Sequence, residues 1–301
     1  MQKIFMKKTA FHGFCMALAD SVPGVSGSTI AFIMGYYETF LLSLHGIFGM
    51  NNDLRKQSVT YLAKFAVGWA AGIITSILII SRIFEVKAYF LSSIFLGLTV
   101  VAIPVIVNEE IESFKGKYRN LIFTLIGFLL VVGLGILKGS VGSLASINFL
   151  ELGLVQYIYL AVSGLLAISA MLLPGVSGST LLLIFGVYVS TVNAVKHVLH
   201  FDFRYLPGIL ALSFGIIVGA ATIARYIRAA LKKFRPQMMY FILGLLLGSL
   251  HAIVMGPSTL DVPQPPLSIS NFSIIGFAIG IGILGGLELV KRKTQKDVGA
   301  I

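Results

Sequence analysis

The sequence repeats one heptapeptide, PGVSGST, at Pro23–Thr29 and again at Pro174–Thr180, an offset of 151 residues (174 − 23) in a chain of 301. Proline, glycine and serine interrupt helices, and inside a membrane an interruption leaves backbone groups without hydrogen-bond partners. Such a break is tolerated only where the backbone is buried in protein or lines a polar cavity. Two breaks at matching places therefore predict two repeated halves with a binding site between them, as in transporters.

The composition indicates an integral membrane protein. Hydrophobic residues make up 57% of the chain and charged residues 12%, and the mean hydropathy is +0.94, whereas soluble domains carry about 25% charged residues. The apolar runs have the length of spanning helices. The net charge of +11 does not indicate nucleic-acid binding, because the lysines and arginines lie in short loops, where they set topology and contact lipid headgroups. Cys15 is the single cysteine, which excludes an internal disulfide.

The duplication extends beyond the heptapeptide. At the same offset of 151, the matches are Gly35 and Gly186, Tyr37 and Tyr188, Tyr89-Phe90 and Tyr240-Phe241, and Gly97 and Gly248. A Gly-x-x-x-Gly pattern that begins at Gly68 recurs at Gly215, at an offset of 147. We therefore predict two homologous halves, 1–145 and 146–301, within one integral membrane domain.

Each half is predicted to contain a helical hairpin broken at PGVSGST and three transmembrane helices, so the fold class is an all-α polytopic membrane protein. The hairpins are expected at 9–45 and 155–198. The spans are expected at about 61–82, 88–107 and 119–138 in the first half, and at about 206–227, 238–256 and 272–290 in the second. Either a full crossing and return or a re-entrant hairpin satisfies the pattern, because neither makes a net crossing.

The charges of the loops predict that the repeats are inverted. Three net crossings per half is an odd number, so the second half must be inverted relative to the first. Segment 256–271 contains Asp261 and no lysine or arginine, which places it outside. Arg225–Arg235 and Lys291–Lys296 are rich in base and belong inside. Both termini are then cytoplasmic, and only the turn 82–88 departs from the rule.

The heptapeptide has the chemistry of an anion site. Pro23-Gly24 and Pro174-Gly175 supply the helix breaks, and glycine allows the backbone to approach a ligand closely. Successive amides in such a turn, leading into the next helix, favour negative charge. The groups expected to bind belong to Ser26, Gly27, Ser28 and Thr29 and to Ser177, Gly178, Ser179 and Thr180. The alternative is that small residues here only allow tight helix packing and cap the broken ends.

Two acids beside the first copy are candidates for ion coupling. Asp20 precedes the motif and Glu38 follows it, whereas the matching positions of the second copy are Met171 and Val189. An ionisable group inside a membrane is a functional candidate by default, so either acid could take a proton or a coupling cation such as sodium. The alternative for both is a helix-end carboxylate near the interface.

Basic residues and metal ligands complete the candidates. Arg82 and Arg225 could reach a phosphate, or could extend to the lipid headgroups. The five histidines show no zinc-binding spacing, so we expect no metal site and no cofactor. The sequence leaves the oligomeric state open, homo-oligomers included.

The residues from Asp20 to Ile30, followed by Gly35-Tyr-Tyr-Glu38, resemble the signature of the DUF368 family of bacterial membrane proteins. The second heptapeptide and the chain length agree as well, so the resemblance covers nearly the whole chain. It implies a multi-pass protein of the bacterial cell membrane that returns undecaprenyl phosphate, a polyprenyl-phosphate lipid, from the outer to the cytoplasmic leaflet. The predicted fold suits this activity, because two hairpin tips could hold the phosphate head while the tail stays in the bilayer.

Two other functions remain as alternatives. PGVSGST is similar to the P-G-x-S-R-S-x-x-T motif of undecaprenyl-pyrophosphate phosphatases, but Gly27 and Gly178 stand at the arginine position and no E-x-x-x-E pair flanks either copy. Without that positive charge, phosphoryl transfer lacks its main stabilisation, so we expect no enzyme. The other alternative is a secondary transporter of a small soluble anion.

Overall fold

The computed structural model describes residues 2–20, 26–49, 51–76, 81–141, 148–259 and 264–299. All the regular elements within these ranges are helices, which confirms the all-α prediction. The first half contains α1 (Gln2–Asp20), α2 (Gly27–Ile33), α3 (Tyr37–Gly46), α4 (Asn52–Thr75), α5 (Ser81–Glu109), α6 (Ile111–Phe114) and α7 (Leu121–Val141). The second half contains α8 (Leu154–Met171), α9 (Gly178–Ile184), α10 (Tyr188–Leu199), α11 (Leu206–Lys233), α12 (Arg235–Val254) and α13 (Ile274–Gly299).

Six helical segments of the described chain are long and apolar enough to cross a membrane, which agrees with a polytopic membrane protein. They are Asn52–Thr75, Lys87–Glu109, Tyr118–Leu137, Leu154–Met171, Phe203–Lys233 and Arg235–Val254. Five of them overlap predicted spans, and the sixth, α8, is the first arm of the predicted second hairpin. The remaining predicted span, 272–290, falls on α13, whose described apolar part is the shorter segment Ile274–Gly286.

Two helix boundaries differ from the sequence prediction for local reasons. The predicted span 61–82 begins earlier, at Asn52, because the side chain of Asn51 accepts hydrogen bonds from the backbone amides of Asp53 and Leu54 and so caps α4. The predicted turn 82–88 is helical, and only Lys87 has non-helical dihedral angles, φ −133° and ψ 46°. This residue kinks α5 where a loop was expected.

The broken segments contain three helices each rather than the two arms of a simple hairpin. In the second half, α8 ends at Met171 and α9 begins at Gly178, so the helix break coincides with the heptapeptide as predicted. The returning arm then breaks again, at Gly35 between α2 and α3 and at Gly186 between α9 and α10. Both glycines have positive φ, 74° and 67°, which L side chains rarely adopt. The matched pair Gly35 and Gly186 therefore marks a second turn in each repeat.

Equivalent helices of the two halves pack in the same way. α1 packs along α4, and α8 packs along α11. A Cβ atom added at Gly68 would overlap the backbone oxygen of Ala10, and one added at Gly215 would overlap that of Ala161. Ala10 and Ala161 are themselves 151 residues apart. The Gly-x-x-x-Gly patterns therefore allow the same close helix crossing in each half.

Alanine at either crossing should destabilise the protein, because the added methyl group meets backbone that cannot rotate away. We expect Gly68→Ala and Gly215→Ala each to lower the free energy of unfolding by about 1–3 kcal/mol. Gly133→Ala is the matched control, since nothing lies within 4 Å of its added Cβ and alanine favours the helix. Thermal unfolding of the detergent-solubilised protein measures the effect, and equal midpoints for Gly68→Ala and Gly133→Ala would contradict it.

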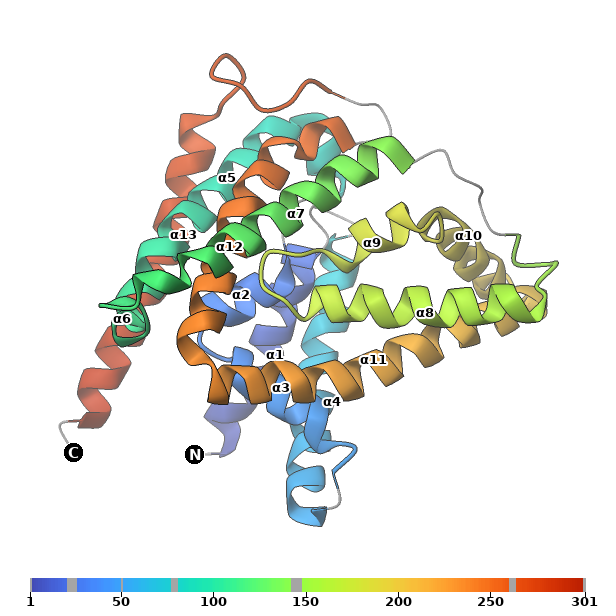
Figure 1. Cartoon of the computed structure of the whole chain (residues 1–301), viewed down its shortest axis with the longest axis horizontal. Coiled ribbons are helices and arrows are strands. Elements are labelled where there is room, and N and C mark those ends of the chain that lie inside the picture. Colours follow the sequence, from blue (N-terminus) through green and yellow to red (C-terminus); the bar gives the residue numbers. More distant parts are fainter. Residues whose placement is uncertain are drawn as a thin grey trace.

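The two halves interlock around one core. The third predicted span of each half packs against the second predicted span of the other, α7 along α12 and α13 along α5. Figure 1 shows these four helices side by side. The largest buried cluster draws on α1 to α6 and on α11 to α13, and Leu172 from the second broken segment joins it. The core therefore holds the first broken segment against the start of the second heptapeptide.

The described chain ends lie on the same side of the molecule. α1 begins and α13 ends toward the lower edge of Figure 1, while segment 264–272 lies at its upper edge. The loop charges predict this same separation, with the termini on one side and the loop before α13 on the other. The inverted orientation of the halves and the cytoplasmic position of the termini stay predictions.

Candidate functional site

The two heptapeptides meet through hydrogen bonds. The backbone amide of Gly175 donates to Oγ1 of Thr29 at 2.8 Å. The Oγ of Ser28 donates toward the backbone oxygens of Met171 and Leu173, at 2.7 and 3.0 Å. The first copy therefore bonds directly to the backbone that leads into and begins the second copy. Pro23 and Gly24 lie outside the described residues.

A tyrosine of the first repeat strengthens this junction. The hydroxyl of Tyr37, in the first turn of α3, donates to the backbone oxygen of Leu172 at 2.7 Å. The neighbouring Tyr36 donates to the backbone oxygen of His12 at 3.0 Å and stacks on its ring. One tyrosine thus joins α3 to the second repeat, and the other joins it to α1.

The turn at the second copy requires glycine. Gly175 has φ 86°, and a Cβ atom there would lie 2.6 Å from the backbone oxygen of Leu245. Pro174 is fully buried beside it. Since Leu245 belongs to α12, the Pro-Gly turn packs between the first copy and a helix of its own half. The close approach seen at Gly175 is therefore to protein backbone, and approach to a ligand stays a prediction.

Both copies have the same internal hydrogen bond. The hydroxyls of Ser26 and Ser28 lie 2.7 Å apart, and those of Ser177 and Ser179 lie 2.8 Å apart. In the first copy Ser26 is extended, with φ −118° and ψ 132°, and α2 begins at the next residue. The serine spacing therefore places two hydroxyls together at the start of α2 and, in the same way, of α9. Each helix has only seven residues, so hydroxyl and amide donors matter more here than a helix dipole.

The two copies differ in exposure. All three hydroxyl side chains of the first copy are at most 4% exposed, whereas all three of the second copy are half-buried. The tyrosines differ in the same direction, because Tyr37 is 2% exposed and Tyr188 is 37% exposed. The first copy is thus enclosed and bonded to its neighbours, and the second presents Ser177, Ser179 and Thr180 to its surroundings.

Asp20 lies against the first copy. Its Oδ1 accepts a hydrogen bond from the backbone amide of Gly27 at 2.7 Å. Its Oδ2 is buried and has no partner among the described residues. A Cβ atom at Gly27 would overlap this carboxylate and the side chain of Met16, which explains why glycine follows Ser26. A buried carboxyl group with one unpaired oxygen can hold a proton or bind a cation.

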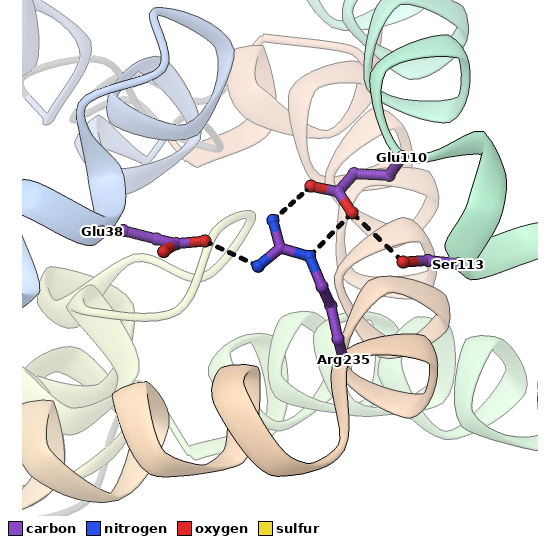
Figure 2. Close-up of polar contacts among 4 residues, drawn as sticks. All are labelled: Glu38, Glu110, Ser113 and Arg235. Atoms are coloured by element: carbon purple, nitrogen blue, oxygen red, sulfur yellow. Dashed lines mark hydrogen bonds and ion pairs between the residues drawn. The ribbon is translucent and has the colours of Figure 1, made fainter.

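Glu38, the other predicted acid, belongs to a network shown in Figure 2. Its Oε1 lies 3.0 Å from Nη1 of Arg235, and Arg235 also binds Glu110 through Nε and Nη2. Ser113 donates to the same Glu110 carboxylate at 3.1 Å. The network joins α3 and the junction between α5 and α6 to the start of α12. From the sequence, Arg235 is only part of a basic segment. Nothing in the sequence pairs it with Glu38 and Glu110, which lie 197 and 125 residues away.

The predicted arginines do not join the motif in this structure. Arg225 is exposed on α11. Its positive charge and that of Arg228 act electrostatically on the imidazole of His45. None of the hydrogen bonds of the described motif residues involves Arg225. The side chain of Arg82 lies outside the described ones. In the described part of the chain, no three His, Cys, Asp or Glu side chains gather as a metal site, so a cation at Asp20 would need backbone or hydroxyl oxygens as further ligands.

The helical fold and the two bonded heptapeptides define a multi-pass membrane protein in which broken helices meet at a central site. The chain belongs to the VCA0040-like family, described as undecaprenyl phosphate translocase-like, whose model matches residues 16–269. This match confirms the family that the sequence motifs indicated.

Two curated relatives are named polyprenyl-phosphate transporter. The protein from Vibrio cholerae is 31% identical over 255 residues, which cover 81% of this chain and 76% of the relative. The protein from Staphylococcus aureus is 30% identical over 273 residues, which cover 89% of this chain and 93% of the relative. No solved structure matches the chain significantly.

Proposed function

We propose that this protein is a polyprenyl-phosphate translocase of the bacterial cell membrane, and that it returns undecaprenyl phosphate from the outer to the cytoplasmic leaflet. The family and the names of the two relatives support the substrate. The observation that carries the site is the pair of heptapeptides joined through Thr29 and Gly175 at 2.8 Å. Inside the membrane, the anionic head of the lipid needs a cluster of hydrogen-bond donors, whereas the apolar tail needs none.

In the proposed mechanism the phosphate head replaces its hydration by hydrogen bonds from the heptapeptides. The half-buried hydroxyls of Ser177, Ser179 and Thr180 receive it in the conformation described here. The first copy is enclosed in this state and opens when the repeats exchange their roles, which delivers the head to the other leaflet. The tail stays in lipid against the exposed apolar faces of helices such as α7, α8 and α11.

The geometry favours transport over hydrolysis. In phosphatases with a related motif, an arginine occupies the place of Gly27 and Gly178. A Cβ atom at Gly178 would lie 2.8 Å from the backbone oxygen of Ala167, and one at Gly27 would overlap Asp20 and Met16. An arginine at either position would therefore displace its neighbours, so neither copy accommodates the arginine that the phosphatase motif has at this place.

Leaflet-to-leaflet movement of labelled undecaprenyl phosphate in proteoliposomes tests the proposal. We expect Ser177→Ala/Ser179→Ala to slow movement about tenfold or more at low lipid concentration, since a hydrogen bond to a charged group contributes about 1.5–3 kcal/mol. Ser268→Ala/Ser270→Ala is the matched control, because those serines form the same pair, 2.9 Å apart, in an exposed segment.

The other outcomes separate the alternatives. Equal rates of lipid movement in both double variants would show that the second heptapeptide is not part of the binding site. Uptake of a soluble anion without any lipid movement would favour the anion transporter. Release of inorganic phosphate from undecaprenyl pyrophosphate would favour the enzyme instead.

A further inference from the structure

Arg235 is held in a fixed orientation by Glu110. Its Nε and Nη2 both bond to that carboxylate, with an Nε–Oε2 distance of 2.9 Å, so the contact is bidentate. Ser113 donates to the same carboxylate and fixes it in turn. The Glu110 side chain is only 18% exposed, while that of Arg235 is 43% exposed. The guanidinium is thus anchored on one edge and accessible on the other.

The accessible edge of Arg235 carries a weaker partner. Glu38 makes one bond to it, Nη1 to Oε1 at 3.0 Å, and its side chain is 58% exposed. Exposed single-contact ion pairs contribute little and are easily exchanged. A guanidinium binds a phosphate more strongly than it binds one carboxylate oxygen, because it can offer two parallel donors and meets up to two negative charges.

The surroundings favour an anion at this place. The end of α11 directly before Arg235 carries the exposed basic residues Arg225, Arg228, Lys232 and Lys233. Such a group of like charges raises the local concentration of anions. With Glu109 and Glu112, which flank Glu110, the acids number four, and Arg235 with these four basic residues makes five.

The network is also adjacent to the junction of the heptapeptides. Glu38 follows Tyr37 in the first turn of α3, and the Tyr37 hydroxyl donates to the backbone oxygen of Leu172, two residues before Pro174. Glu38 is therefore one residue away from the tyrosine that bonds to the backbone leading into the second copy. An anion bound at Arg235 would lie close to the link between the repeats.

We propose that Arg235 receives the phosphomonoester head of the lipid substrate in exchange for Glu38, with Glu110 and Ser113 as positioning residues. The inference rests on the proposed translocase function and adds a second station for the head, beside the heptapeptides. In the predicted topology this station lies on the cytoplasmic side, where the returned lipid leaves. Glu38 then reoccupies Arg235 when the head departs, which restores the link between α3 and α12.

Binding of radiolabelled farnesyl phosphate to the full chain in detergent tests the exchange. We expect Arg235→Gln to weaken binding roughly 10–100-fold, and Glu38→Gln to tighten it about two- to fivefold, because the internal competitor is gone. Arg235→Lys should recover only part of the affinity, since lysine keeps the charge but loses the bidentate geometry. Arg55→Gln, at an exposed residue near the start of α4, is the control for a change of net charge alone.

The outcomes distinguish this inference from the function on which it rests. A parent protein that binds neither farnesyl phosphate nor any longer polyprenyl phosphate contradicts the proposed function itself. A parent that binds, with Arg235→Gln and Arg55→Gln equally affected, overturns the role of Arg235 alone. If Arg235→Gln fails to fold, Glu38→Gln decides, because unchanged or weaker binding there rules out the exchange. Inorganic phosphate and farnesol, as competitors, show whether head and tail are both needed.

Discussion

Gly175→Ala should have the largest structural effect of any single methyl group added to the site, lowering the free energy of unfolding by about 2–5 kcal/mol. Two costs combine at this residue. Its φ of 86° is unfavourable for an L side chain, and the new Cβ would lie 2.6 Å from the backbone oxygen of Leu245. Relief of that overlap must move the turn, and the turn holds the amide that donates to Thr29. We therefore expect leaflet-to-leaflet lipid movement to be lost even in protein that still folds.

Gly116→Ala separates the two costs. Gly116 has φ 73°, but nothing lies within 4 Å of a Cβ atom added there. Gly116→Ala should therefore lower the free energy of unfolding only by the conformational cost, about 1 kcal/mol. Thermal unfolding in detergent gives the two midpoints, and lipid movement in proteoliposomes gives the two activities. Equal destabilisation, with transport intact in Gly175→Ala, would show that contact between the turn and α12 is not required.

Much of this fold could be predicted from the sequence repeat, because equivalent helix contacts in the two halves require glycine at equivalent positions. Gly68 and Gly215 are spaced as a pair because each faces the backbone of the first helix of its half, α1 or α8. Gly35 and Gly186 match because both have positive φ. Backbone constraints of this kind restrict the residue type at single positions, so they can be detected in one sequence. The predicted helices follow for the same reason, since apolar length is a local property.

The contacts between elements could not be predicted in this way. Arg235 binds Glu38 and Glu110 across 197 and 125 residues, and an arginine at a helix start reads equally well as a lipid-facing cation. The unequal exposure of the two heptapeptides could not be predicted either, because two identical sequences do not indicate which copy is enclosed. Only the differing neighbours, Asp20 against Met171 and Glu38 against Val189, indicated that the site is asymmetric.

Asp20→Asn should uncouple transport while leaving the fold intact. An asparagine oxygen can still accept the hydrogen bond from the amide of Gly27 at 2.7 Å, and its amide group replaces an oxygen that has no partner among the described residues. The protein therefore keeps its packing but loses the group that can bind a proton or cation. We expect lipid movement to continue toward equal distribution and to stop responding to an ion gradient.

The magnitude of the response follows from the energy that a gradient supplies. A step of one pH unit is worth about 1.4 kcal/mol per proton, so coupling of one proton per lipid can shift the distribution between leaflets at most about tenfold. We expect the parent to show such a shift under a pH step or a sodium step, and Asp20→Asn to show none under the same step. Asp53→Asn, an exposed aspartate in the first turn of α4, should behave as the parent. A full response in Asp20→Asn would mean that the buried carboxyl group serves only to cap Gly27, and that the driving ion is bound elsewhere.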